Sequence, residues 1–290
     1  MTEPFKHPAD PVTERWKLPE GWRPEPFFAV GAVSQYIGAA IAVVLFETIP
    51  ASTVALLRVV GAGAILVLIR RSWRRTWTRE GLIRAAVFGS VLAAMNLSFY
   101  LAIDRLPLGN AVAIEFLGPV AVAALGAHSV RRRGPLALAV GGVALLAGVT
   151  PEGTLPGVGF ALLAATFWAG YIILGARVAQ SGSGVDGLGV GMLIGAIVIS
   201  PVTAAGLAGL WAVPMLALLA LATGLLSNAI PYAIDQVVLT RIDRSRFALL
   251  QSLLPVTATV VGLVALAQRP SVAELAGILC VAAAIVLAGE

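Results

Sequence analysis

The stretch Arg105-Leu-Pro-Leu-Gly-Asn-Ala-Val-Ala-Ile-Glu-Phe-Leu-Gly-Pro-Val-Ala121 predicts a short turn followed by an apolar helix. That helix contains the carboxylate of Glu115 and a Gly118-Pro119 pair one turn later. An ionisable group inside hydrocarbon is costly, and it usually faces the interior of a helix bundle or a water-filled cavity. Proline removes a backbone donor and bends a helix, which a membrane tolerates only where neighbours satisfy the freed carbonyl. The stretch therefore predicts a kinked membrane helix with a functional group beside the kink.

The composition of the whole chain supports a membrane location. Of its 290 residues, 59% are hydrophobic and 12% are charged, and the mean hydropathy is +0.92. A soluble domain carries about 25% charged residues. The 31 glycines are typical of membrane helices that pack closely through small residues. We therefore expect an all-α membrane protein that crosses the bilayer many times, and not a large soluble core.

Several classes of chemistry find no support in the sequence. The single cysteine, Cys280, excludes an intramolecular disulfide and a cysteine-based metal cluster, and His7 and His128 form no metal-binding pattern. There is no Gly-rich phosphate loop and no Ser/His/Asp grouping. The net charge of +5 comes from arginines between hydrophobic spans, so nucleic acid is not an expected partner. We expect no enzyme activity, no cofactor and no metal; the partners are the lipid bilayer and a small-molecule substrate.

The order of apolar runs predicts ten transmembrane helices, each of roughly 17–25 residues, the length that crosses a bilayer. Residues 1–26 are polar and proline-rich and lack the apolar core of a signal peptide, so we expect a disordered cytoplasmic tail. The predicted spans cover about 27–46, 52–69, 82–101, 109–129, 134–149, 157–177, 187–207, 214–235, 247–266 and 272–289.

The arginines between the spans predict the orientation. With the N-terminus inside, the outer loops carry only Arg105 and Arg269. The inner loops carry Arg70, Arg71, Arg74, Arg75, Arg79, Arg131, Arg132, Arg133, Arg177, Arg241, Arg244 and Arg246. This asymmetry agrees with the rule that cytoplasmic loops are positively charged, and it favours an even number of spans with both termini in the cytoplasm.

A weak internal repeat indicates the topology. A shift of 136 residues places the 105–126 stretch on 241–262, so that Glu115 meets Gln251 and Pro119 meets Pro255. Helix kinks are expected at both prolines. The shift pairs span four with span nine and divides the chain into two five-helix repeats, 27–150 and 157–290. Because each half has an odd number of spans, the halves insert in opposite directions, an architecture typical of secondary transporters.

Three polar residues of the first half are expected at similar depth. Counting residues from the outer ends of their spans places Arg58, Glu115 and Asn96 on the order of 8–9 Å below the outer edge of the hydrocarbon. Tyr100 lies one helical turn above Asn96. One interpretation is a substrate or proton site, in which Arg58 holds a carboxylate by a bidentate fork and Glu115 holds an ammonium or a proton. The other is a permanent Arg58–Glu115 ion pair that joins two helices.

Further candidates for the pathway lie on other spans. Aromatic and amide side chains at the middle of a span face a cavity or pack in the core, and both interpretations stay open for each of them. The candidates are Gln35, Tyr36, Trp168, Tyr171, Asn228, Tyr232 and Gln251.

At this point the motifs resemble a known family. Pro107-Leu-Gly-Asn-Ala-Val-Ala-Ile-Glu-Phe-Leu-Gly-Pro-Val-Ala-Val122 is similar to the span-four motif of the EamA-type drug/metabolite transporters, and most similar to that of bacterial threonine/homoserine exporters. The likeness continues in Ala55-Leu-Leu-Arg58, Met95-Asn-Leu-Ser-Phe-Tyr100, Leu226-Ser-Asn-Ala-Ile-Pro-Tyr232 and Leu239-Thr-Arg-Ile242.

The resemblance implies ten helices in two inverted repeats and export of small amino acids across the bacterial inner membrane by proton antiport. One departure concerns span nine, where these exporters tend to carry a glutamate before the proline and this chain has Leu254. The alternatives are an exporter of another small metabolite or drug of the same superfamily, and a non-transporting scaffold or receptor.

Overall fold

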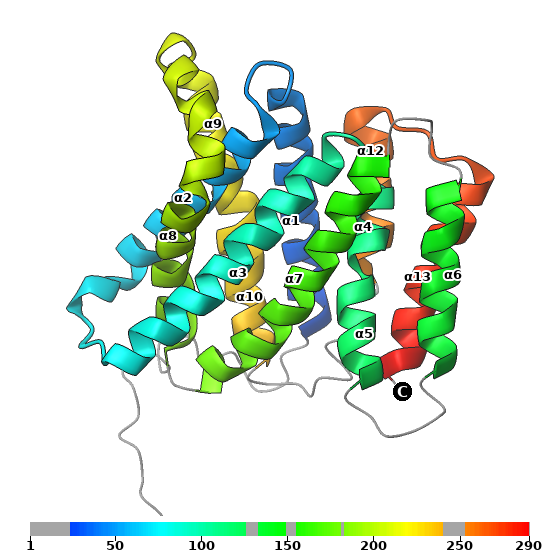
Figure 1. Ribbon diagram of the computed structural model, residues 1–290, viewed down its shortest axis with the longest axis horizontal. Helices are drawn as coiled ribbons and strands as arrows, with labels where there is room; N and C mark the ends of the chain where they lie inside the picture. Colours follow the sequence, from blue (N-terminus) through cyan, green and yellow to red (C-terminus); the bar gives the residue numbers. More distant parts are fainter. Residues whose placement is uncertain (1–23, 126–132, 149–154, 181–182, 240–252, 290) are drawn as a thin grey trace, which may run out of the picture.

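The computed structural model describes residues 24–125, 133–148, 155–180, 183–239 and 253–289. In these ranges the chain is helical throughout, with no strand. Figure 1 shows the helices running between two ends of one bundle. The connections 46–50, 104–107 and 267–271 lie at the upper end of this view, and the connection 71–78 lies at the lower end.

The helices follow the predicted spans closely. In the first half they are α1 (Pro24–Leu45), α2 (Ala51–Arg70), α3 (Arg79–Ile103), α4 (Leu108–Glu115), α5 (Leu117–Leu125) and α6 (Arg133–Gly148). In the second half they are α7 (Leu155–Gln180), α8 (Gly184–Thr203), α9 (Pro214–Gly224), the π-helical turn η5 (Leu225–Ala229), α10 (Ile230–Leu239), α12 (Leu253–Leu266) and α13 (Val272–Gly289). Short 3₁₀ segments follow α2 (η2, Ser72–Arg74) and α8 (η4, Ala204–Ala212).

Two spans are interrupted within their length. Predicted span four is divided into α4 and α5, and predicted span eight contains the turn η5 between α9 and α10. Six apolar segments are long enough to cross a membrane, and three further apolar helices among the described residues are shorter. The predicted tail lies outside the described residues except at its end, where α1 begins at Pro24.

Helices from the two halves of the chain interleave. Helix α3 packs between α7 and α8, α2 packs on α8 and α9, and α6 packs on α13. Helix α1 contacts α10 and α12, and α4 contacts α7 and α12. Each side of the bundle in Figure 1 therefore contains helices that are far apart in the sequence.

Glycine permits the closest of these contacts. A Cβ atom on Gly89 of α3 would overlap the backbone of Gly191 on α8, and one on Gly195 would overlap the backbone of Gly89. Lipid supplies little hydrophobic driving force between helices, so association depends on close packing through small residues. The α3–α8 contact therefore requires these glycines.

The outer surface of the bundle is apolar over much of its area. Large hydrophobic side chains such as Ile197, Val202, Val264 and Leu68 are 63–79% exposed. An apolar surface of this kind is costly in water and favourable against lipid chains. Buried polar side chains lie both inside the bundle, as Arg58, Glu115 and Asn228 do, and at its ends, as Asp186 and Asn110 do.

Candidate functional site

The interruption of span four lies directly after Glu115. Pro119 has no N–H, so the carbonyl of Glu115, four residues earlier, receives no helical hydrogen bond from it. Helix α4 ends at Glu115, Phe116 forms a single turn residue, and α5 begins at Leu117. This interruption, one turn before Pro119, places the end of a helix at the carboxylate, and the kink expected at Pro119 stays a prediction. Pro255 is the third residue of α12, and residues 247–252, which are needed to define a kink there, lie outside the described ranges.

A second proline explains the π-helical turn of span eight. Pro231 cannot donate to the carbonyl of Leu226 or Ser227, five and four residues earlier. Both carbonyls accept from side chains of other helices. The Ser34 hydroxyl donates to Leu226 O at 2.8 Å, and Arg58 Nη2 donates to Ser227 O at 3.2 Å. Side chains of α1 and α2 therefore supply the hydrogen bonds that the irregular backbone of this turn needs inside a membrane.

Arg58 is held by this turn. Its Nε donates to Asn228 Oδ1 at 2.8 Å, and its Nη2 donates to the same oxygen. The guanidinium carbon lies 4.5 Å from the centre of the Tyr100 ring, which adds a cation–π contact from α3. Arg58 is 2% exposed and Asn228 is fully buried. Two of the three guanidinium nitrogens are thus bound to Asn228 and Ser227, and Nη1 has no hydrogen-bond partner among the described residues.

Glu115 contrasts with Arg58. Its side chain is 6% exposed, and within the described ranges it makes no ion pair and no hydrogen bond. The charged side chain that acts on it electrostatically is Arg58. The permanent Arg58–Glu115 ion pair considered from the sequence is therefore not present in the described part of the chain.

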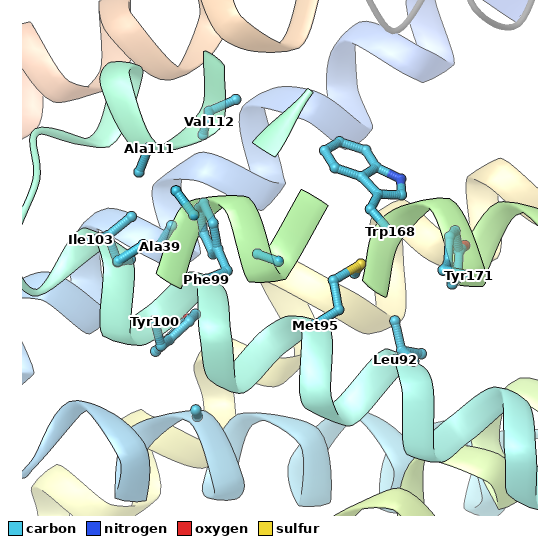
Figure 2. Packing of buried hydrophobic residues seen from close by; sticks show 14 of the residues in the cluster. Ala39, Leu92, Met95, Phe99, Tyr100, Ile103, Ala111, Val112, Trp168 and Tyr171 are labelled. Atoms are coloured by element: carbon cyan, nitrogen blue, oxygen red, sulfur yellow. The ribbon is translucent and has the colours of Figure 1, made fainter. Parts of the chain in front are cut away.

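Aromatic side chains line the region around Glu115. The ring of Phe116 meets the Trp168 indole edge-on, with 4.5 Å between ring centres. Tyr171, one turn further along α7, lies 5.6 Å from Tyr232 of α10 and stacks on Phe88 at 5.3 Å. Figure 2 shows Trp168 and Tyr171 on α7, with Met95 and Leu92 of α3 below them in this view.

The remaining candidates take different positions. Tyr36 is 1% exposed and lies within electrostatic range of Glu115, Arg58 and Tyr232, so it belongs to the same interior cluster. Asn96 donates to the carbonyl of Leu92 in its own helix at 2.8 Å. Gln35 takes part through its backbone carbonyl, which accepts from the Ser227 hydroxyl at 3.1 Å. Gln251 lies outside the described residues.

We use the name central cluster for the interior group that these residues form. Its members come from α1, α2, α3, α4, α7, η5 and α10, that is, from both halves of the chain. They are Tyr36, Arg58, Asn96, Tyr100, Glu115, Trp168, Tyr171, Asn228 and Tyr232, all less than 9% exposed.

Two further residues beside the cluster, Ser227 and Phe116, were not among the candidates predicted from the sequence. Ser227 contributes its carbonyl, and the available signal was Pro231, four residues later. Phe116 was hidden in an apolar run. Leu254, the position at which the resemblance led us to expect a glutamate, is buried at the start of α12.

Two polar groups outside the central cluster were also missed. At the lower end, the buried carboxylate of Asp186 on α8 accepts from Arg70 at 3.0 Å and from Ser72 at 2.7 Å, and Arg75 lies 3.6 Å away. These contacts join the end of α2 to the start of α8. The sequence alone does not indicate that these residues meet, because Arg70 and Asp186 are 116 residues apart.

At the upper end, Asn110 Nδ2 donates to Glu274 at 2.5 Å, and the backbone N–H of Leu108 donates to Gln268 Oε1 at 3.0 Å. A cavity of about 140 Å³ lies beside these contacts. It is lined by Pro107, Gly109, Asn110, Thr259, Gln268, Arg269, Pro270, Glu274 and Ile278. Within the described ranges no three metal-ligating side chains lie together.

Comparisons with known proteins identify relatives of this chain. The threonine/homoserine exporter RhtA of Salmonella typhimurium (strain LT2) is 36% identical over 257 residues, which cover 87% of this chain and 86% of the relative. RhtA of Escherichia coli (strain K12) is 34% identical over 252 residues, 85% of this chain and 84% of the relative.

A family model and a solved structure extend the comparison. Residues 155–289 match the model of the EamA-like transporter family. A crystal structure of an 18% identical protein aligns with 92% of this chain and 98% of its own, with a TM-score of 0.59, which supports the fold alone. The identity to the exporters over most of the chain, together with the family match, shows that the protein belongs to the EamA-like transporter family.

Proposed function

We propose that the protein exports small amino acids such as threonine and homoserine across the bacterial inner membrane by proton antiport. As a member of a transporter family it is not an enzyme, and it acts on a small-molecule substrate within the lipid bilayer. The observation that carries the proposal is the 34–36% identity to threonine/homoserine exporters over 85–87% of the chain.

We further propose that the bundle consists of ten spans in two inverted repeats, 27–150 and 157–290. The contacts between helices support this proposal, because they occur in pairs that are related by exchanging the two repeats. In the two repeats, the helices would correspond in order: α1 to α7, α2 to α8, α3 to α9–α10, α4–α5 to α12, and α6 to α13. The contact between α3 and α7 then corresponds to the contact between α10 and α1. In the same way α3–α8 corresponds to α9–α2, and α4–α7 corresponds to α12–α1. The contacts α2–α8, α4–α12 and α6–α13 map onto themselves.

The orientation proposed here places both termini in the cytoplasm. The lower end of Figure 1 is then the cytoplasmic face, because the 71–78 connection and its neighbours carry Arg70, Arg71, Arg74, Arg75 and Arg79. Fusion of alkaline phosphatase after Glu290 tests this orientation. We expect an inactive enzyme, whereas a green fluorescent protein fused at the same point should fluoresce. An active phosphatase would reverse the assignment.

Glu115 is the residue to which we assign coupling. A buried carboxylate is stable when it carries a proton or when it pairs with a cation, and costly when it does neither. Within the described ranges the protein offers Glu115 no such partner, so a proton from outside and the ammonium group of a substrate from inside can occupy it in turn. This alternation exchanges one proton for one substrate.

Because the central cluster is buried, each exchange requires helices of one half to move against the other. The symmetric contacts between the halves supply surfaces for such rocking, as in other transporters with inverted repeats.

A second candidate is export of another small metabolite of similar size. The observation that favours it is Leu254, which places a buried apolar side chain where the exporters tend to carry a glutamate. If that glutamate contributes to recognition, the substrate of this chain is less polar than threonine.

An efflux assay tests the proposal. Purified protein in proteoliposomes loaded with labelled threonine or homoserine should release the amino acid faster when a proton gradient is applied than when it is collapsed. In cells, overexpression should raise tolerance to excess homoserine. Unchanged tolerance with confirmed expression, together with no release from proteoliposomes, would remove the amino-acid assignment. A screen of other labelled metabolites would then identify the second candidate.

A further inference from the structure

Three buried polar atoms of the central cluster have no hydrogen-bond partner among the described residues. They are Arg58 Nη1, Asn228 Nδ2 and the hydroxyl oxygen of Tyr100. All three side chains are at most 2% exposed. Buried polar groups in proteins are nearly always hydrogen-bonded, and each exception calls for an explanation.

These three atoms belong to side chains that touch one another. Asn228 accepts two hydrogen bonds from Arg58, and the guanidinium group of Arg58 lies over the Tyr100 ring. The three residues come from η5, α2 and α3. They therefore form one local group between the two halves of the chain, and we call it the donor group.

The chemistry of Arg58 fixes the orientation of the Asn228 amide. A guanidinium group has only donors, so the atom of Asn228 that faces it is the carbonyl oxygen. The amide nitrogen of Asn228 consequently points away from the guanidinium and keeps both of its N–H groups available. Along with Arg58 Nη1, it presents donors and a positive charge with no hydrogen-bond acceptor among the described residues, and the Tyr100 hydroxyl lies beside them, close to Arg58, Ser227 and Thr223.

A set of buried donors around a positive charge is satisfied by an anion with several lone pairs. A carboxylate has two oxygens with about four lone-pair sites, and its single negative charge matches the single guanidinium. A cation or an apolar group would leave the donors unpaired, which is costly in a buried site.

We propose that Arg58, Asn228 and Tyr100 bind the carboxylate group of the transported substrate. The proposal rests on the proposed function and names the half of the substrate that this group recognises. Asn228 has two roles: it positions the Arg58 guanidinium through Oδ1 and contacts the carboxylate through Nδ2.

The opposite charges of Arg58 and Glu115 predict how a substrate lies between them. Arg58 acts electrostatically on Glu115 without pairing with it. A zwitterion oriented with its carboxylate on the donor group and its ammonium toward Glu115 neutralises both buried charges. An amine without a carboxylate, or a carboxylate without an amine, neutralises only one of them, so amino acids are preferred over both classes.

The test uses thermal melting of the purified full-length protein in detergent with three probes of similar size. Threonine carries both groups, 3-hydroxybutanoate lacks the amine, and threoninol lacks the carboxylate. We expect threonine to protect most, 3-hydroxybutanoate to protect weakly and threoninol not to protect.

Two variants separate the donor group from general stability. Asn228→Asp keeps an acceptor for Arg58 but replaces the N–H donor with a carboxylate that competes with the substrate. We expect the melting temperature without ligand to be retained and threonine affinity to fall by at least about ten-fold. Tyr100→Phe removes only the hydroxyl and keeps the ring under Arg58, and we expect affinity to fall several-fold, with stability retained. Glu80→Gln, at an exposed carboxylate on α3, is the control and should bind threonine like the unchanged protein.

The outcomes distinguish this proposal from the exporter assignment. If threonine is exported but threoninol protects as well as threonine, and both variants bind threonine normally, the carboxylate site is wrong and export stands. If threonine neither binds nor crosses, but another carboxylate in an amino-acid panel binds and loses affinity in Tyr100→Phe, the substrate is wrong and the carboxylate site stands. If no carboxylate protects the folded protein, the proposed site is overturned.

Discussion

The surroundings of Arg58 and of Glu115 show two ways to keep a charge inside a membrane protein. Arg58 is bound by the amide of Asn228, the carbonyl of Ser227 and the ring of Tyr100. Glu115 is equally buried, at the end of a broken helix, and within the described ranges no group of the protein binds it. A charge with fixed partners is part of the architecture, whereas a charge without partners is free to exchange them. This difference is the basis of our proposal that Arg58 anchors and orients the substrate, whereas Glu115 exchanges proton and substrate.

Replacement of Arg58 should have the largest effect. Arg58→Met leaves the Asn228 and Ser227 oxygens without their buried donors, so we expect the free energy of unfolding to fall by about 3 kcal/mol and transport to be lost. Thermal melting in detergent and efflux from proteoliposomes measure the two effects. A variant that melts like the unchanged protein would show that Arg58 is not anchored as the contacts indicate.

Replacement of Glu115 should separate transport from stability. Glu115→Gln breaks no hydrogen bond within the described ranges, so we expect the free energy of unfolding to change by less than about 1 kcal/mol. The variant cannot exchange a proton, so efflux should fall more than about ten-fold and become insensitive to the proton gradient. Efflux at several pH values and melting of the same preparation check both statements. Retained, proton-driven efflux would assign coupling to another residue.

A change at Pro231 probes why Arg58 is anchored. Pro231→Ala supplies an N–H that can bond to the carbonyl of Ser227 and compete with Arg58 Nη2. We expect the π-helical turn to relax toward a regular helix and threonine affinity to fall by roughly three-fold, equivalent to about 0.7 kcal/mol. Titration of threonine with melting as the readout measures this change. An unchanged affinity would mean that Asn228 alone positions the guanidinium.

The smallest effect is expected at a surface carboxylate that undergoes the same chemical change as Glu115. Glu80 pairs with Arg84 at 3.7 Å, and the two side chains are 83% and 47% exposed. Exposed pairs contribute little, so Glu80→Gln should change the free energy of unfolding by less than about 0.5 kcal/mol and leave efflux unchanged. A large loss of efflux in this variant would show that the effect of Glu115→Gln is not specific to a buried site.

The helices and most members of the central cluster were predictable from the sequence. Apolar run length located the helices, and a polar residue inside such a run identified Arg58, Glu115, Asn96 and Asn228 as candidates. The partners were not predictable. Sequence analysis considered Glu115 as the partner of Arg58 because both were expected at similar depth, but the structure joins Arg58 to Asn228, 170 residues away. Depth along the membrane is a one-dimensional estimate and says nothing about which helices are neighbours.

Local physical chemistry explains the part of this protein that the sequence determined by itself. Hydrophobicity over a span places helices in the bilayer, and a missing N–H at Pro119 and at Pro231 coincides with an interruption four or five residues earlier. Packing decided the rest. The backbone of Gly61 lies so close to Leu221, and that of Gly224 so close to Arg58, that a Cβ atom on either glycine would overlap its neighbour. That approach of α2 and α9 brings Asn228 to Arg58 and leaves Glu115 without a partner, because hydrogen bonds reach only about 3 Å and only the folded bundle determines which groups come that close.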